Sequence, residues 1–183
     1  IVKKEHIDKI KEKIEELSSK YNCKNNIIEC VEPFINKTDI IKEIRKLTHA
    51  EAEIMAKLAV EDTKMGNVYH KTLKHHLVAD KTPGTEDLET KALSGDRGLT
   101  LIEMAPYGII GAITPSTNPS CTVICNSIAM LAGGNGVLFN PHPHAKRISA
   151  YAVDLVNRAV LAAGGPENIV ATVANPTMET SNM

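Results

Sequence analysis

The sequence has little of what marks several classes of protein. It has no tryptophan, its aromatic content is 3%, and its 183 residues include four cysteines. No two of these cysteines form a C-x-x-C pair, and they stand at positions 23, 30, 121 and 125. This spacing indicates neither the disulfide framework of a small secreted protein nor a zinc site. Reduced thiols in a cytoplasm fit it best.

The chain also lacks a strong charge and a long apolar run. Its formal net charge of -1 gives no field that would attract nucleic acid or an anionic membrane surface. No segment approaches the roughly 20 apolar residues that cross a bilayer. A hydrophobic content of 43% is enough for one sizeable core. We therefore expect a soluble, cytoplasmic protein with no nucleic acid or membrane partner.

The first third of the chain has the periodicity of helices. Between positions 6 and 17 the apolar residues step by three and four, which predicts an amphipathic helix that either packs on its own domain or docks the protein onto a partner. A second helix is predicted from Thr38 to about Lys64, ended by the turn at Gly66. Its expected buried residues are Ile40, Ile41, Ile44, Leu47, Ile54, Met55, Leu58 and Ala59.

Residues 80–98 are rich in Thr, Pro, Gly, Asp and Glu, which predicts a connection at the surface. A short strand is expected at 99–104, and a turn at 106–108. The apolar run Ile109–Ile113 then predicts a strand covered on both faces, as in a parallel sheet.

From this strand onward, strands and helices alternate. A helix should begin at Pro119 and end at Gly133, a strand should follow at 136–139, and a second helix should span Ala145–Ala163. A third strand at 169–173 and the start of a helix near Thr177 complete the pattern. Together they predict an α/β fold, with a partial Rossmann-like parallel sheet (βαβαβ) that a helical segment precedes.

Ligands of such sheets bind beyond the carboxyl ends of the strands, where residues 114–119 and 140–143 lie. The usual G-x-G-x-x-G fingerprint is absent from the first of these loops, so the sequence predicts only a nucleotide cleft of another kind. Asn140 stands where an acidic residue often accepts the ribose hydroxyls of NAD. It could hydrogen-bond a ribose, or it could only cap the next turn, and its neutral amide leaves the choice between NAD and NADP open.

Asn118 is the strongest candidate for chemistry. Its carboxamide directly precedes a predicted helix N-terminus, where free N–H groups favour negative charge, so it could stabilise an oxyanion. Its simpler role would be that of an N-cap, with Asn118 or Thr117 accepting the helix N–H groups.

Neither the histidines nor the cysteines indicate a metal site or a nucleophile. His70, His75 and His76, and separately His142 and His144, lack the spacing of a metal site, so we expect no metal. Cys125 should be a small buried residue rather than a nucleophile.

Residues 104–119, MAPYGIIGAITPSTNP, resemble the P-x-G-(x4)-I-x-P-x-x-N-P signature of the aldehyde dehydrogenase superfamily. The Ser-Thr-Asn-Pro form is similar to its CoA-acylating branch, as are 139–146 (FNPHPHAK) and the segment from Leu58 to Asn67. Residues 81–88 and 133–135 are most similar to the propionaldehyde and acetaldehyde dehydrogenases of bacterial microcompartments.

This resemblance implies oxidation of a short-chain aldehyde through a cysteine thiohemiacetal, hydride transfer to NAD and capture of the acyl group by coenzyme A. It implies that Asn118 holds the oxyanion. The residues it places along the cofactor cleft, which CoA later shares, are Ile113, Thr114, Pro115, Ser116, Asn140, Pro141 and His142. A homo-oligomer in the cytoplasm or in a microcompartment lumen, with the shell as a further partner, would fit.

The family's nucleophilic cysteine belongs downstream of residue 183, so no cysteine of this chain inherits the role. We expect an N-terminal fragment of such an enzyme, inactive alone. Its predicted parts are residues 1–79 (helical), 80–105 (connection and strand) and 106–183 (the first part of the nucleotide-binding domain). The alternative is a non-catalytic module that binds a nucleotide or CoA, or that serves microcompartment assembly. Which aldehyde is used stays open.

Overall fold

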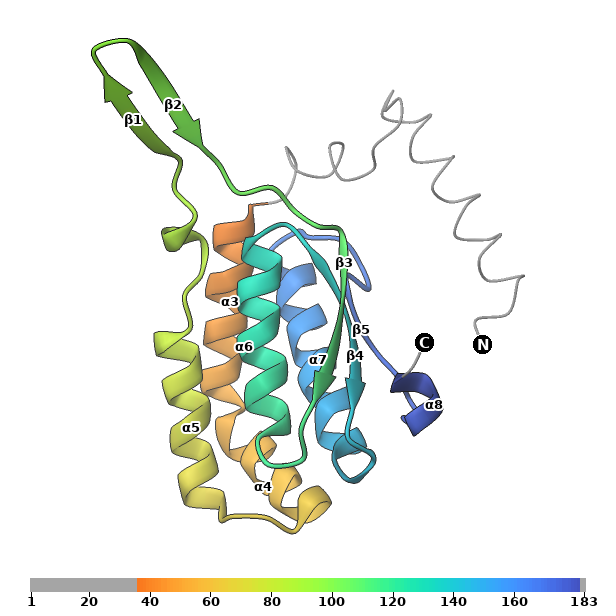
Figure 1. Ribbon diagram of the computed structural model, residues 1–183. Coiled ribbons are helices and arrows are strands. Elements are labelled where there is room, and N and C mark those ends of the chain that lie inside the picture. The colour runs from red at the N-terminus through yellow and green to blue at the C-terminus, as the bar shows by residue number, and fades with distance from the viewer. Residues whose placement is uncertain (1–35, 182–183) are drawn as a thin grey trace. The chain divides into compact units, whose positions relative to one another are not determined.

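The computed structural model describes residues 36–181, which lie in one compact unit (Figure 1). The predicted helix at 6–17 lies outside these residues. Three helices come first: α3 (Lys37–Ala50), α4 (Ala52–Thr63) and α5 (Val68–Lys81). Asn36 caps the first of them and Asn67 the third, each by accepting a backbone N–H three residues ahead.

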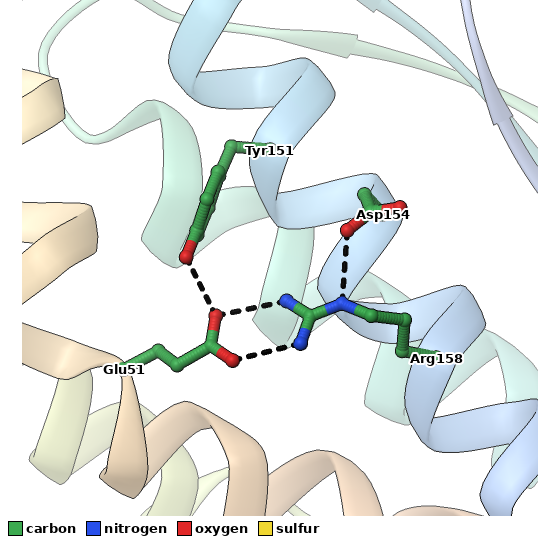
Figure 2. Close-up of polar contacts among 4 residues, drawn as sticks. All are labelled: Glu51, Tyr151, Asp154 and Arg158. Carbon is green, nitrogen blue, oxygen red and sulfur yellow. Dashed lines mark hydrogen bonds and ion pairs between the residues drawn. The ribbon is translucent and has the colours of Figure 1, made fainter.

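The single helix predicted over 38–64 is wrong, because Glu51 interrupts it. Its backbone (φ -109°, ψ 11°) ends α3 and precedes α4, and its side chain is held by α7. The carboxylate accepts two hydrogen bonds from the Arg158 guanidinium at 2.8 Å each and one from the Tyr151 hydroxyl at 2.7 Å (Figure 2). Within the expected buried stripe, Ile54 is exposed and Leu47 and Leu58 are half-buried, while smaller residues outside it, Thr48, Ala52 and Ala56, are buried instead.

The connection predicted at 80–98 contains structure of its own. A 3₁₀ turn, η2 (Thr85–Asp87), is followed by β1 (Lys91–Gly95), which pairs antiparallel with β2 (Gly98–Ile102) across a two-residue turn. The expected strand at 99–104 is therefore one half of a hairpin. All ten hairpin residues are exposed, and in Figure 1 the hairpin extends away from the helices.

The predicted βαβαβ unit is confirmed. It consists of β3 (Ile109–Thr114), α6 (Pro119–Ala132), β4 (Gly136–Pro141), α7 (Lys146–Ala162) and β5 (Val170–Thr172). A 3₁₀ turn, η3 (Pro143–Ala145), leads into α7, and a short helix, α8 (Met178–Ser181), follows the sheet. The three strands are parallel in the order β3-β4-β5.

One face of this sheet is covered by helices. Ala112, Val137, Phe139 and Val170 are buried on it, against the apolar sides of α6 and α7. Behind these two helices α3 packs on both, so the core is continuous from the sheet to the first helices (Figure 1).

Within residues 36–181 the other face is exposed along β3, so the prediction that β3 is buried on both faces is wrong there. Ile109 is 83% exposed, Ile113 70% and Leu138 44%. Successive strand residues alternate between the two faces, so an all-apolar strand supplies both, whereas the described helices pack on only one.

Candidate functional site

Asn118 stands where β3 has ended and α6 begins. Its main chain begins the helix, since its carbonyl oxygen accepts a hydrogen bond from the N–H of Thr122 at 3.0 Å. Its side chain makes no capping hydrogen bond. The role of side-chain N-cap considered for Asn118 or Thr117 is therefore wrong, because the Asn118 carboxamide turns toward α5 instead.

Two lysines of α5 bind the Thr117–Asn118 segment. The Nζ of Lys74 lies 3.1 Å from the Asn118 Oδ1, and the Nζ of Lys71 lies 3.1 Å from the Thr117 carbonyl oxygen. In residues 36–181 neither ammonium group has a carboxylate within ion-pair distance. Lys71 is 7% exposed, and burial lowers its pKa from the usual value of lysine.

These residues line a cavity of about 420 Å³ that opens beside Asn118. The turn after α4 forms its other wall, where Lys64 and Gly66 both have positive φ angles, 57° and 74°. Eight residues line the cavity: Met65, Gly66, Asn67, His70, Lys71, Lys74, Thr117 and Asn118. It is a positively lined cavity with a carboxamide at one end.

A buried pair fixes the first turn of α6. The His75 Nε2 lies 2.7 Å from the Ser120 hydroxyl oxygen, and the two residues are 1% and 2% exposed. Burial lowers the pKa of His75 to about 4, so its ring is neutral near pH 7. The pair joins α5 to α6 two residues beyond Asn118.

The other predicted site residues lie together at the carboxyl ends of β3 and β4. Ile113 is the register partner of Asn140, and Thr114 that of Pro141. The His142 N–H donates to the Thr114 carbonyl oxygen at 3.0 Å, which joins the two loops. Ile113, Pro115 and His142 are exposed, Ser116 is half-buried, and Thr114, Asn140 and Pro141 are buried.

The Asn140 side chain is buried and makes a hydrogen bond within the fold. It is 8% exposed, and its Oδ1 accepts a hydrogen bond from the Thr180 hydroxyl of α8 at 3.3 Å. The buried Thr114 hydroxyl has no hydrogen-bond partner within the described part of the chain. At this strand edge the Asn140 side chain therefore has a hydrogen-bond partner, whereas the Thr114 hydroxyl has none within the described residues.

Cys121 is a poor nucleophile in this structure. Burial raises the pKa of Cys121 to about 11 despite the nearby Lys71 and Lys74 ammonium groups. Cys125 was expected to be buried but is half-buried, because its side of α6 is incompletely covered. Between residues 36 and 181 no group of three or more His, Cys, Asp or Glu side chains could hold a metal ion. In the same range no helix is long and apolar enough to cross a membrane.

Sequence reasoning missed Lys71 and Lys74. Lysines three residues apart on a helix are the usual composition of a solvated face, and only the packing of α5 beside α6 brings them to Asn118. It also missed Asn135, whose Oδ1 accepts the N–H groups of Tyr107 and Gly108 and so holds the turn that leads into β3.

Comparisons with known proteins show which family this chain resembles. The sequence profile of the Aldehyde dehydrogenase family matches residues 32–183. The chain is 51% identical over 141 residues to the acetaldehyde dehydrogenase (acetylating) EutE of Escherichia coli K12. These matched residues cover 77% of this chain and 30% of that protein.

Solved structures agree. A propionaldehyde dehydrogenase from the Clostridium phytofermentans fucose utilisation bacterial microcompartment has 55% identity and a TM-score of 0.77, over 91% of this chain and 37% of the other. The Rhodopseudomonas palustris propionaldehyde dehydrogenase was solved with bound CoA and an acylated cysteine. It has 50% identity and a TM-score of 0.76, over 80% of this chain and 34% of the other.

The chain thus spans about a third of the length of the relatives it matches. The resemblance to the CoA-acylating, microcompartment-associated branch is confirmed by these relatives. Since the family profile matches residues 32–183, the chain belongs to the aldehyde dehydrogenase family.

Proposed function

We propose that this chain is the N-terminal part of an enzyme that oxidises a short-chain aldehyde, propionaldehyde or acetaldehyde, with NAD and transfers the acyl group to coenzyme A. The observation that carries this proposal is the carboxamide of Asn118, which stands free of helix capping beside a cavity. The names of the relatives support the substrate class.

Asn118 supplies the chemistry that such a reaction needs most. When a thiolate attacks an aldehyde carbon, a C–S bond forms and the π electrons of the C=O bond move to the oxygen, which becomes an oxyanion. The Nδ2 of Asn118 has no hydrogen-bond partner within residues 36–181, so it can donate to that oxygen. One fixed donor of this kind contributes roughly 10²-fold or more to the rate.

The position of the strand-end residues supports a dinucleotide site. Ile113 is 70% exposed at the carboxyl end of β3, beside Asn140 and Pro141 of β4, where ligands of parallel sheets bind. We propose that Ile113, Thr114, Pro115, Ser116, Asn140, Pro141 and His142 line a cleft that NAD occupies and CoA later shares. When bound, NAD accepts the hydride and the CoA thiol accepts the acyl group. A flat ring of the nucleotide can pack on the exposed apolar surface of these residues.

The nucleophile would come from a part of the enzyme beyond these 183 residues. Cys121 is protonated at neutral pH because its pKa is raised to about 11, and both described cysteines lie within α6. The coverage of about a third of each relative supports the same interpretation. We accordingly propose that residues 1–183 alone do not catalyse aldehyde oxidation.

The intact mass of the natural protein tests this proposal. We expect a species about two and a half times the 19.9 kDa of this chain, because the matched part is 77% of this chain but 30% of its curated relative. That species should reduce NAD in the presence of propionaldehyde and CoA, whereas residues 1–183 alone should not. Turnover by residues 1–183 alone, or a natural protein of only this length, would contradict the proposal.

The same assay tests the alternative, a non-catalytic module that binds a nucleotide or CoA or serves assembly. This alternative predicts no aldehyde turnover from any natural form.

We propose that the protein is located in the cytoplasm or in a microcompartment lumen, because one solved relative comes from a microcompartment. Deleting residues 1–20 and measuring retention in purified shells would show whether the N-terminal segment directs packaging.

A further inference from the structure

A carboxamide has two chemically different ends, and only one of them can stabilise an oxyanion. The Nδ2 of asparagine donates hydrogen bonds and the Oδ1 accepts them, and the two ends exchange places when the side chain turns by half a rotation. An Asn118 with no fixed partner would offer its oxygen to the reacting centre as readily as its nitrogen. The partial negative charge of the Asn118 Oδ1 would then repel the developing oxyanion.

Lys74 removes this ambiguity. An ammonium group has three donors and no acceptor, so it can bind only the oxygen of a carboxamide. Its Nζ lies 3.1 Å from the Asn118 Oδ1, and the Asn118 side chain makes no other hydrogen bond within the described residues. The chemistry of this pair therefore directs the Nδ2 away from Lys74.

The neighbouring lysine fixes the backbone on the other side. Lys71 lies three residues earlier on α5, and its Nζ donates to the Thr117 carbonyl oxygen at 3.1 Å. The two lysines share one face of α5, which packs on α6. One holds the peptide before Asn118 and the other holds its side chain.

From this arrangement we infer that Lys74 is a positioning residue for aldehyde oxidation, holding the Asn118 carboxamide with its Nδ2 toward the reacting oxygen. The inference rests on the proposed function. In addition, the Lys74 charge has no carboxylate partner in residues 36–181, so it polarises the amide and adds to the positive potential beside the developing oxyanion. Lys74 itself acts through Asn118 and need not touch the substrate.

Steady-state kinetics of the complete enzyme that carries these residues test the inference. We expect Lys74→Met to lower kcat about tenfold, with the KM for propionaldehyde and for CoA within twofold of the parent, because ground-state binding does not need the fixed amide. Lys74→Arg, which keeps a charged donor, should restore most of kcat. Lys57→Met is the matched control, since Lys57 is exposed on α4 and within residues 36–181 pairs only with Glu53.

A double-mutant cycle separates positioning from folding. Asn118→Ala should lower kcat about 10²-fold or more, and adding Lys74→Met to it should cost less than a further twofold, since Lys74 acts through Asn118. A defect in folding would instead lower activity in both backgrounds and shift the thermal midpoint. If Lys74→Met does not fold, Lys74→Ala, which also lacks a donor, takes its place.

The outcomes that overturn the inference differ from those that overturn the proposed function. A parental kcat for Lys74→Met, together with a large loss for Asn118→Ala, rejects the role of Lys74 alone. An equal loss from Lys74→Met in both backgrounds also rejects it. Failure of the complete enzyme to make acyl-CoA rejects the proposed function itself.

Discussion

The imidazole of His75 and the hydroxyl of Ser120 meet at 2.7 Å in the interior, one from the middle of α5 and the other from the first turn of α6. The Nδ1 of the ring has no hydrogen-bond partner among the described residues. A charged ring would be costly there, so the site that carries Asn118 is supported by a histidine that must stay neutral.

The pH dependence of stability should report this histidine. The unfolded chain protonates His75 near pH 6.5, whereas the folded chain does so only near pH 4, because burial lowers its pKa. The unfolded state thus binds more protons between these values, so the free energy of unfolding falls as the pH is lowered from 6.5 to 4, by up to ~3 kcal/mol. Below pH 4 this contribution falls no further.

Thermal unfolding at a series of pH values measures this effect. His75→Gln should flatten the dependence between pH 6.5 and 4, whereas His144→Gln, at an exposed position, should leave it intact. An equal slope in His75→Gln and the parent would show that another group causes it.

The ion pair at the α3–α4 break should contribute to stability. Arg158 binds both carboxylate oxygens of Glu51 at 2.8 Å, so Glu51→Gln should lower the free energy of unfolding by about 1 kcal/mol at pH 7. The Arg158 hydrogen bonds lower the pKa of Glu51, so this stabilisation is present above pH 4.5 and is lost as the pH falls through the folded-state value. Denaturant titration measures it, with Glu61→Gln as the control, because Glu61 is exposed and has no ion-pair partner within residues 36–181. Equal midpoints for both variants would contradict the account.

A residue of α4 caps α7. The Asp62 carboxylate accepts the N–H groups of Arg147 and Ile148 at 3.0 and 3.1 Å, and Ala145, at the N-cap position, cannot do so. Asp62→Ala should cost about 1 kcal/mol and Asp62→Asn less, because the amide oxygen can still accept. Glu61→Ala is the neighbouring control. Chemical denaturation of the three variants decides, and equal stabilities would argue against the cap.

Cys121 should be slow to alkylate. With a pKa of about 11, roughly one molecule in a thousand carries the thiolate at pH 8. Mass spectrometry after iodoacetamide treatment should find Cys121 unmodified in the folded protein and modified in urea. Labelling at the same rate in both conditions would contradict its raised pKa.

The parallel unit could be predicted because its signals are local. Pro119 and Gly133 mark the ends of α6, and the apolar runs at 109–113 and 136–139 mark two strands, all within a residue or two of where they lie. The strand-end loops followed from the topology, since parallel strands place their carboxyl ends at one edge.

What could not be predicted depends on contacts distant in the sequence. No glycine or proline marks the break at Glu51, and its partner Arg158 is 107 residues away. The grouping of Lys74 with Asn118 spans 44 residues between two helices, and no periodicity encodes it. The motif thus identified the carboxamide, and the packing of α5 revealed what orients it.

Product analysis of the complete enzyme tests the central claim most directly. Given propionaldehyde, NAD and CoA, it should form one propionyl-CoA for each NADH, and Asn118→Ala should lower that rate about 10²-fold or more because the oxyanion loses its donor. Free propionate formed at the same rate with or without CoA, or an Asn118→Ala variant as fast as the parent, would contradict the account.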